Sequence, residues 1–450
     1  MNGKSTAYRP KKINDDTISE GETHNVIHFT IPANMECNGK ELSLRLDGHD
    51  DEESTIKSLQ EAMADIRVKS LECRYFTWNE QITTVINALL QCDDRDWNEL
   101  TIQSCSGQLS PNLARMHRLR CLTLSMVPIT EPLHLNPHLE ELSLFEVSLP
   151  EYVTRSLGES LARSSIRIKK LDLTDSRFIE NASAILALAL RENVTLDTLC
   201  ISECNLMDEQ IEEIVWALER HPAIRNLDIS FNKCRSSGVL ALTRLIRSET
   251  CKLTNLSMDF QAFGEGKRID VAPILAALSS TNNCPLRELG LGGNSLRDGD
   301  MSDLVNTLCT NQTISKLDLS ENRFSDHGIQ ILAEGLPEMK GLRHVILDDN
   351  RFGPIGLEAV ANALEKNTGI VEIEVSQNLK DSDAWSRVLY FLDTNWGGRH
   401  ILQEEHPVPL GLWPLLMGRA SQRKPEWMSR TPSAQDIIYC LVRGPAILHR

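Results

Sequence analysis

Apolar residues alternate with polar ones in a short phrase that returns along the chain. Residues 314–324 read ISKLDLSENRF, residues 342–352 read LRHVILDDNRF, and residues 370–380 read IVEIEVSQNLK. Such alternation is typical of a short β-strand with one buried face. We therefore expect the two leucines of LDL in the first copy to point inward and Asp318 to point outward.

A helical pattern follows each strand phrase. Residues 326–336, DHGIQILAEGL, place apolar side chains three and four positions apart, which is typical of an amphipathic helix. Residues 210–220 and 356–367 show the same spacing. One strand and one helix cannot bury an apolar face alone. We therefore expect the units to stack and share a core, with strands inside the curve and helices outside.

Each phrase has the form L-x-x-L-x-L-x-x-N-x-L, and its asparagine position is expected to be buried. A polar side chain there can bond backbone groups that the turn after the strand leaves unpaired. The position recurs at a nearly constant step, with one longer step before Asn294, and is filled by Ser176, Cys204, Asn232, Gln261, Asn294, Asn322, Asn350 and Asn378. So regular a period indicates a repeat array.

This signature is that of the leucine-rich repeat, and the unit length resembles the ribonuclease-inhibitor-like subfamily. The resemblance implies an α/β fold: a right-handed solenoid, or horseshoe, with parallel strands on the concave face and helices on the convex face. Residues 166–378 match it well. Residues 39–165 are predicted to be degenerate or short repeats, because Val127 and Val147 stand at the asparagine position and lie too close together for a full helix between them.

The two ends of the chain lack the repeat pattern. Residues 1–38 are polar and are predicted to be a disordered lead-in. Residues 379–450 hold four of the seven tryptophans and are predicted to form a helical cap on the last repeat or, alternatively, a docking module. This tail resembles that of leucine-rich repeat proteins from diatoms and related algae, a resemblance that implies no activity.

Composition narrows the classes of partner. The formal charge of −16 and the pI near 5.3 argue against nucleic acid or an anionic membrane as the main partner. The start of the chain has no secretory signal, and no apolar run is long enough to span a bilayer. Twelve cysteines without paired spacing fit a reducing compartment, so we expect the cytosol or the nucleus.

No motif for catalysis, a cofactor or a metal stands out. Gly-Lys-Ser at residues 3–5 lacks the upstream glycine and the strand of a phosphate loop, and GLGGN at 290–294 falls on the repeat phrase. Cys200 and Cys204 should face opposite ways in the repeat register, which favours structural thiols over a metal clamp. A non-enzymatic protein without cofactor is therefore predicted.

A GTPase regulator is the alternative. The repeats are also similar to those of the activating protein for the Ran GTPase, in which an arginine in a strand–helix loop is important. Arg177, Arg323 and Arg351 occupy such loops here. The long acidic C-terminal run of that family is missing from this sequence, which counts against the alternative.

The concave face is the candidate for protein binding. Its outward strand positions are largely acidic, and Phe231 and Phe260 are expected to be exposed neighbours on adjacent strands. Aromatic anchors within a charged rim are typical of protein interfaces, and acidic groups steer a basic partner. The predicted site comprises Asp228, Phe231, Asp259, Phe260, Asp318, Glu321, Asp348, Asp349 and Glu374.

Two features of this prediction stay open. Short acidic side chains are also common in such repeats for solubility alone, so the face could simply be solvated. The unit between Gln261 and Asn294 is longer than the others around FGEGKRID (263–270), which predicts a protruding loop beside the phenylalanines. The oligomeric state and the identity of the partner are not specified by the sequence.

Overall fold

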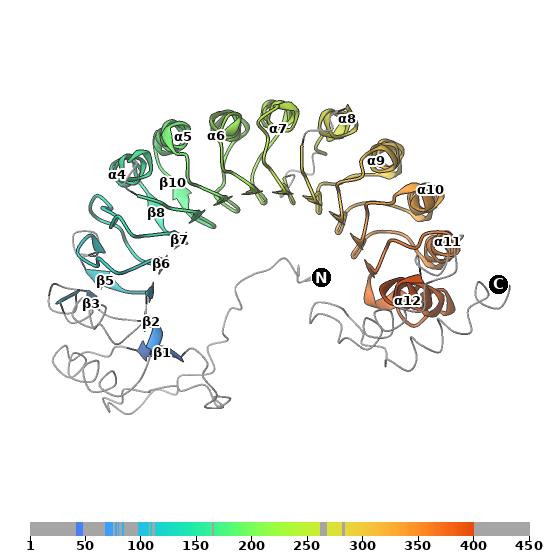
Figure 1. Ribbon diagram of the computed structural model, residues 1–450, viewed down its shortest axis with the longest axis horizontal. Coiled ribbons are helices and arrows are strands. Elements are labelled where there is room, and N and C mark those ends of the chain that lie inside the picture. Colours follow the sequence, from blue (N-terminus) through green and yellow to red (C-terminus); the bar gives the residue numbers. More distant parts are fainter. Residues whose placement is uncertain are drawn as a thin grey trace, which may run out of the picture.

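The computed structural model is an arch of stacked strand–turn–helix units (Figure 1). It describes residues 42–47, 68–74, 77–78, 80, 83–84, 98–107, 109, 113–163, 166–261, 268–280 and 284–399. Within these residues, thirteen parallel strands form one sheet along the inner side of the arch, in chain order, and helices cover the outer side (Figure 1). The predicted α/β leucine-rich-repeat solenoid is confirmed.

The strands of the main sheet are short, and from β9 onward each has three residues. They are β1 (Leu42–Asp47), β2 (Val68–Arg74), β4 (Glu99–Gln103), β6 (Cys121–Ser125), β7 (Glu141–Phe145), β9 (Lys170–Asp172), β11 (Thr198–Cys200), β12 (Asn226–Asp228), β13 (Asn255–Ser257), β14 (Glu288–Gly290), β15 (Lys316–Asp318), β16 (His344–Ile346) and β17 (Glu372–Glu374). Two small sheets pair β3 (Thr77–Trp78) with β5 (Ser106–Gly107) and β8 (Ser148–Leu149) with β10 (Arg177–Phe178).

The register of the sheet follows the repeat. Leu317 pairs with Leu289 on one side and with Val345 on the other, and all three are buried. Asp318 is in register with Gly290 and Ile346 and lies on the concave side, as the alternation of side chains predicts. The segment predicted to hold degenerate repeats contributes β1, β2, β4, β6 and β7 to the same sheet, whereas its boundaries stay a prediction.

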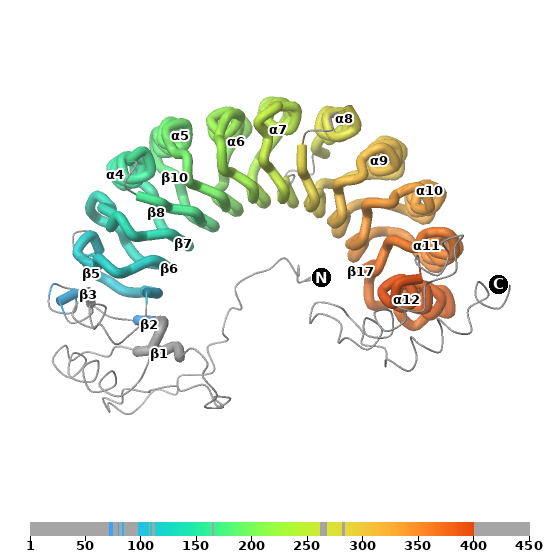
Figure 2. Tube along the Cα trace, in the orientation of Figure 1, coloured from blue at the N-terminus to red at the C-terminus, as the bar shows by residue number. Residues whose placement is uncertain are grey.

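From β7 onward, one helix follows each strand of the main sheet along the convex side (Figure 2), whereas residues 126–140, between β6 and β7, form no helix. The described helices are α4 (Glu151–Ala162), α5 (Ala182–Glu192), α6 (Asp208–Leu218), α7 (Ser236–Arg247), α8 (Ala272–Ser280), α9 (Asp298–Thr310), α10 (Asp326–Gly335), α11 (Pro354–Leu364) and α12 (Asp383–Trp396). Their predicted apolar faces are buried: Ile329 and Leu332 of α10 are examples. Each helix packs on the next, so the core runs without a break along the arch.

The asparagine position forms a ladder between repeats. Asn322 Nδ2 donates to Leu291 O of the preceding repeat at 3.0 Å, and Asn322 Oδ1 accepts from the backbone N–H of Leu296 at 3.0 Å. Cys204 makes the equivalent bond through its thiol, with 3.0 Å from Sγ to Leu173 O. Side chains at the other positions from Ser176 to Asn350 likewise donate to a carbonyl of the preceding repeat.

The prediction is wrong for the last position. Asn378 is exposed, because the chain turns into a short 3-10 helix, η2 (Gln377–Leu379), directly after β17. Upstream, the ladder reaches further than the sequence indicated. Cys105 is buried, with its Sγ 3.7 Å from Cys73 O, and it follows β4 at the same repeat position that Cys204 takes after β11.

A residue in the left-handed conformation precedes the asparagine position in most repeats, although not at Asn378. It has φ between 51° and 63° in ten successive repeats: Ser104, Met126, Glu146, Asp175, Glu203, Phe231, Phe260, Gly293, Glu321 and Asp349. This conformation turns the chain sharply out of the strand, and non-glycine residues adopt it only when the surrounding bonds hold them there. The backbone N–H of each Phe supplies such a bond: Phe231 donates to Asp259 O and Phe260 to Gly292 O, both at 2.8 Å.

Aspartates at the helix starts join neighbouring helices. Asp326 Oδ1 accepts from Gly353 N at 2.8 Å and from Gly356 N at 2.7 Å, so its carboxylate lies at the N-terminus of the next helix. Free N–H groups and the helix dipole favour a negative charge there. Asp208 makes the same contact with Gly238 N at 2.8 Å. A Cβ on Gly356 would lie 2.9 Å from Asp326 Oδ1, which explains the glycine.

Helix α12 covers the last repeat. It packs against α11, and its side chains Trp385, Val388 and Leu392 are buried. The rest of the predicted cap, from residue 400, lies outside the described residues, as does the predicted lead-in, 1–38. Helices long and apolar enough to cross a membrane are absent from the part of the chain that the structure describes.

Candidate binding groove on the concave face

All nine residues of the predicted site line one groove on the concave face. Six further residues line it with them, so that the concave groove is defined by Ser202, Asp228, Ser230, Phe231, Ser257, Asp259, Phe260, Lys316, Asp318, Ser320, Glu321, Ile346, Asp348, Asp349 and Glu374. Seven of these side chains are carboxylates and one is a lysine. The groove therefore combines a strong negative charge with one aromatic pair.

The aromatic pair is stacked. The rings of Phe231 and Phe260 have their centroids 4.4 Å apart and their planes 9° from parallel. Each side chain leaves the left-handed turn that follows β12 or β13, so the pair lies beyond the strands and not on them. Both are half-buried rather than exposed as predicted, because each ring covers a face of the other.

Glycines of the next repeat make room for this arrangement. A Cβ on Gly293 would lie 2.3 Å from the Phe260 ring, and a Cβ on Gly290 would lie 2.7 Å from Asp259 Oδ2. Gly292 N donates to Asp259 Oδ1 at 2.7 Å. The glycine-rich segment 290–294 thus accommodates two side chains of the preceding repeat.

Carboxyl groups crowd the centre of the groove. Burial, together with the charges of Asp318 and Asp228, raises the pKa of Asp259 to about 7. Burial also raises the pKa of Asp228. A cation placed between these groups would stabilise their ionised forms, which is the electrostatic basis for binding a basic ligand.

The C-terminal end of the groove holds both signs of charge. His344 Nε2 lies 2.8 Å from Glu374 Oε1, and this contact, with help from Lys316 and Lys380, lowers the pKa of Glu374. Burial and the charge of Asp348 raise the pKa of Asp349. Lys316 and His344 were not predicted as site residues. The sequence could have indicated both residues, because Lys316 and His344 stand two positions before Asp318 and Ile346 and so share the concave side.

One group of side chains in the described residues could hold a metal ion. His344, Glu372 and Glu374 offer three ligand atoms that lie within 4.8 Å of one another. Nitrogen and oxygen donors of this kind suit a divalent transition metal. The hydrogen bond with His344 and the charge of Lys316 already account for the lowered pKa of Glu374, however, so the geometry does not require a metal.

The arginines of the alternative hypothesis lie elsewhere. Arg323 and Arg351 lie in the turns that lead from strand to helix, the first half-buried and the second exposed, whereas Arg177 is exposed at the start of β10. The backbone N–H of Arg323 donates to Leu296 O at 2.8 Å. These three arginines are not among the residues that line the concave groove.

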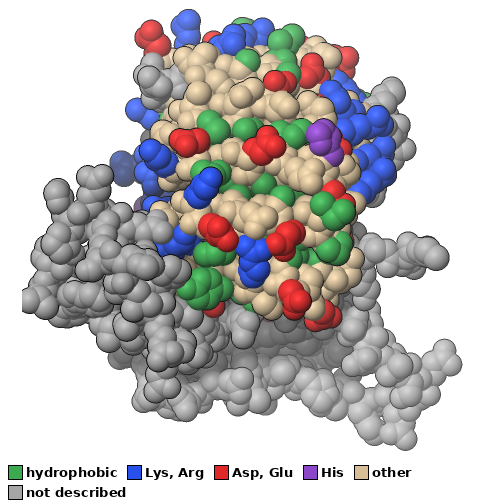
Figure 3. All heavy atoms as spheres, turned by 90° about the vertical axis from the view of Figure 1, so that its right-hand side faces the viewer, with side chains coloured by type: hydrophobic (Ala, Val, Ile, Leu, Met, Phe, Trp, Pro, Cys, Tyr) green, Lys and Arg blue, Asp and Glu red, His purple; other side chains and the backbone are tan. Residues whose placement is uncertain are grey.

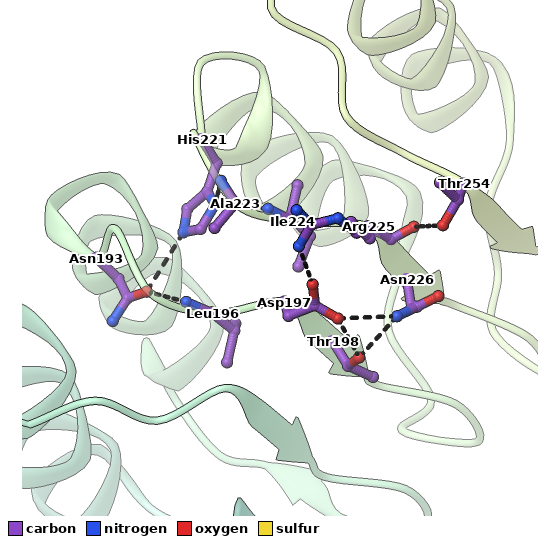
Figure 4. A network of polar contacts seen from close by, with 10 residues as sticks. All are labelled: Asn193, Leu196, Asp197, Thr198, His221, Ala223, Ile224, Arg225, Asn226 and Thr254. Atoms are coloured by element: carbon purple, nitrogen blue, oxygen red, sulfur yellow. Dashed lines mark hydrogen bonds and ion pairs between the residues drawn. The ribbon is translucent and has the colours of Figure 1, made fainter. Parts of the chain in front are cut away.

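A second ladder of polar contacts lies where helices return to the next strand, and Figure 4 shows it between α5 and β11 and between α6 and β12. Asn193 Oδ1 accepts from Leu196 N at 2.8 Å and lies 3.3 Å from His221 Nε2, while His221 Nδ1 accepts from Ile224 N at 3.1 Å. Burial lowers the pKa of His221 to about 4, so its imidazole is neutral at pH 7. Asn311 and Asn367 take the same place further along and bond backbone groups in the same way.

Cysteines occupy this ladder in the two repeats beside the phenylalanines. Cys251 and Cys284 are buried, and their sulfur atoms are 3.4 Å apart. The other pair singled out in the sequence behaves as predicted. Cys200 is half-buried in register between Asp172 and Asp228, whereas Cys204 is buried in the asparagine ladder.

The side of the molecule that carries the C-terminal helices has a different character (Figure 3). Acidic, basic and hydrophobic side chains intermingle there, and blue Lys and Arg side chains gather toward its two flanks. This face therefore differs from the concave groove, whose charged lining consists of seven carboxylates and one lysine.

Comparison of sequences identifies proteins that are similar to part of this chain. No protein-family model matches the chain. It is 26% identical over 225 residues to NACHT, LRR and PYD domains-containing protein 5 of Bos taurus, covering 44% of this chain and 20% of that protein. It is 28% identical over 207 residues to NACHT, LRR and PYD domains-containing protein 12 of Homo sapiens, covering 39% and 19%. The chain thus spans about a fifth of the length of these relatives.

Two solved structures resemble the chain loosely. An internalin from Listeria monocytogenes aligns with a TM-score of 0.38 and 14% identity, over 72% of this chain and 88% of the internalin. The actin-binding site 2 of leiomodin-1 aligns with a TM-score of 0.31 and 15% identity, over 35% of this chain and 89% of that one. Likenesses at this level carry no argument about function.

Proposed function

We propose that this chain is a non-enzymatic protein-binding scaffold that recognises its partner through the concave groove. The single observation that carries the proposal is the stacked pair Phe231–Phe260 set among seven carboxylates in one groove. The relatives support the general class, since leucine-rich repeats (LRR) are part of their names. Assignment to the ribonuclease-inhibitor-like subfamily is part of the proposal and rests on unit length alone.

The mechanism follows from a surface that is formed before the partner arrives. The ladder of Asn322 and its equivalents holds neighbouring repeats together, so little order has to be gained on association. The edges of the stacked rings offer apolar area to one side chain of the partner. The carboxylates around them favour basic groups and speed the encounter with a positively charged surface.

GTPase regulation remains the second hypothesis, and no contact favours it over the first. It requires an arginine that reaches a bound nucleotide, and Arg323 and Arg351 are not among the residues that line the concave groove. Purified wild-type chain should leave the rate of GTP hydrolysis by Ran unchanged. Stimulation by the wild type that is lost in Arg323→Ala would support the second hypothesis instead.

The test of the proposed function compares two double variants of the full chain. Phe231→Ala with Phe260→Ala removes the stacked pair. Leu188→Ala with Leu240→Ala is the matched control, since it removes two apolar side chains that are 61% and 52% exposed on helices α5 and α7. Each protein is used for affinity purification with mass spectrometry, and each captured candidate is then purified and titrated against all three.

Wild type and control should bind the same candidate, and the Phe variant should bind it at least about tenfold more weakly, which corresponds to the loss of a hot-spot residue. Circular dichroism and thermal unfolding establish that all three are folded. Equal binding by the Phe variant would refute the concave groove as the recognition surface.

A further inference from the structure

The chain contains a segment whose charge is opposite to that of the groove. Residues 1–14 carry Lys4, Arg9, Lys11 and Lys12 and no acidic residue, so four basic side chains minus none give a formal +4 within a chain of −16. The same stretch holds an aromatic residue, Tyr8. A positive, partly apolar segment of this kind is the chemistry that the concave groove favours.

The groove offers matching partners for both properties. Carboxylates line it from Asp228 to Glu374, against a single lysine, Lys316. The stacked rings of Phe231 and Phe260 stand among the acids and are half-buried, which suits contact with an aromatic or aliphatic side chain. The groove thus offers both negative charge and an aromatic pair. One short stretch of the same chain carries the positive charge and the aromatic side chain that match them.

We propose that residues 4–12 bind in the concave groove as an intramolecular ligand and compete there with the protein partner. This inference rests on the proposed function of the groove and adds its regulation. A partner would have to displace the segment, or the segment would have to be modified or removed, before the groove could be filled from outside. The partner's own binding region is accordingly expected to be basic, because it competes for the same carboxylates.

The linker is long enough for this contact, because β12 lies seven strand spacings from β1 in the sheet, roughly 35 Å at about 4.8 Å each. Residues 13–41 separate the segment from β1, and a stretch of that length can span up to roughly 100 Å when extended. A tethered ligand also acts at a high local concentration, on the order of millimolar for a flexible linker that spans its sites. Even a weak contact, with a dissociation constant of about 100 µM, would then fill the groove about nine-tenths of the time.

The experiment uses the full chain and a fluorescent synthetic peptide of residues 2–14. One protein is the wild type. The second carries Lys4→Gln, Arg9→Gln, Lys11→Gln and Lys12→Gln, which leaves the groove intact and removes the positive charge of the tethered segment. Anisotropy titrations at low salt measure how each binds the peptide added in trans, and a peptide with the same four glutamines is the control.

The neutralised variant should bind the basic peptide at least about fivefold more tightly than the wild type, whose groove holds its own segment. Binding should weaken as salt rises, and the glutamine peptide should not bind. Asp259→Asn with Asp318→Asn, introduced into the neutralised variant, should weaken peptide binding about tenfold or more. Thermal unfolding shows whether that variant is folded; Phe231→Ala with Phe260→Ala in the same background tests the groove independently.

Other outcomes overturn the inference. Equal peptide binding by wild type and neutralised variant excludes an internal competitor, and absence of binding to both excludes the segment as a ligand. A wild type that sediments as a dimer while the neutralised variant is a monomer would assign the segment to the groove of a second copy. If the peptide fails but the phenylalanines still govern capture of a protein partner, the inference falls and the proposed function stands.

Discussion

Phe231 and Phe260 stack across two repeats of unequal length, with ring centroids 4.4 Å apart, and Gly293 of the third repeat leaves room for the second ring. The three residues occupy the same left-handed position in successive repeats. The shape of the groove at this point is therefore set jointly by three turns that are distant from one another in sequence. A change in any one of them should be felt by the other two.

Replacement of Gly293 by alanine should destabilise the protein and displace Phe260. Gly293 has φ +63°, and a Cβ there would lie 2.3 Å from the ring, so both the backbone and the ring must shift. We expect a loss of about 1–3 kcal/mol in the free energy of unfolding. Urea denaturation measures it. Gly299→Ala in α9 is the control, because nothing lies within 4 Å of its Cβ position, and it should be neutral or slightly stabilising.

Asn322→Ala should remove one set of hydrogen bonds from the asparagine ladder and destabilise the protein. The variant leaves the carbonyl of Leu291 and the backbone N–H groups of Asn294 and Leu296 without their partner inside the core. Buried groups left unpaired cost about 1–3 kcal/mol each, so we expect a loss of at least about 2 kcal/mol. Asn378→Ala removes the same residue type at the equivalent repeat position, but Asn378 is exposed. It should change stability by less than about 0.5 kcal/mol, and equal effects would disprove the role of the ladder.

Asp259 should make the protein less stable as pH rises from about 4 to about 7. Its pKa in the folded chain is about 7, above the ordinary value of 3.8, because it is buried and faces Asp318 and Asp228. The folded state therefore holds the proton more tightly than the unfolded state in this window, and that advantage is gone above pH 7. Asp259→Asn should be more stable than the wild type at pH 8, by on the order of 1–2 kcal/mol.

Urea denaturation at pH 5 and pH 8 checks this. The stability difference between Asp259→Asn and the wild type should be larger at pH 8 than at pH 5. Asp381→Asn, at an exposed carboxylate, serves as control and should show no such trend. A pH-independent difference for Asp259→Asn would mean that the carboxyl is ionised throughout.

His221 should make the protein less stable as pH falls, a pH dependence opposite to that of Asp259. Burial lowers its pKa to about 4, below the ordinary value of 6.5, so the unfolded chain binds a proton there that the folded chain does not. Its contribution to stability is complete above pH 6.5 and is lost as pH falls toward 4. His221→Asn places in this position the residue found at Asn193 and Asn367, and it should lessen the acid-induced loss in melting temperature between pH 7 and pH 4.5.

The matched control for this prediction is His327→Asn, since His327 is exposed in the first turn of α10. That variant should follow the wild-type profile at both pH values. If His221→Asn keeps the wild-type acid sensitivity, the buried imidazole is not the group that titrates.

The periodic part of the fold was predictable because the same pattern of buried and exposed positions recurs in each repeat. Alternation in LDL places Asp318 outward, and the spacing of Ile329 and Leu332 defines the buried side of a helix. These rules depend only on residues within one unit. They were sufficient for the order of strands and for bringing the nine predicted residues to one surface.

The features that the sequence did not predict depend on residues in neighbouring repeats. The partial burial of Phe260 requires Gly293, which belongs to the next repeat, and the exposure of Asn378 reflects the turn that replaces a further repeat. Cys105 was overlooked because cysteine is a weak signal at an asparagine position in a faint repeat. The predicted protruding loop stays a prediction: residues 262–267 lie outside the described residues, and Arg268 beside them pairs with Asp300 at 3.0 Å.

The substitution of thiols for amides in the second ladder has a mechanical consequence. Sulfur donates and accepts only weak hydrogen bonds, so Cys251 and Cys284 brace their turns less firmly than Asn193 and Asn367 brace theirs. Among the described repeats, we therefore expect the turns at Cys251 and Cys284 to yield more readily than those at Asn193 and Asn367, and they belong to the two repeats that carry Phe231 and Phe260. We expect bending at these two turns to widen or narrow the concave groove around a bound partner, while the repeats on either side keep their shape.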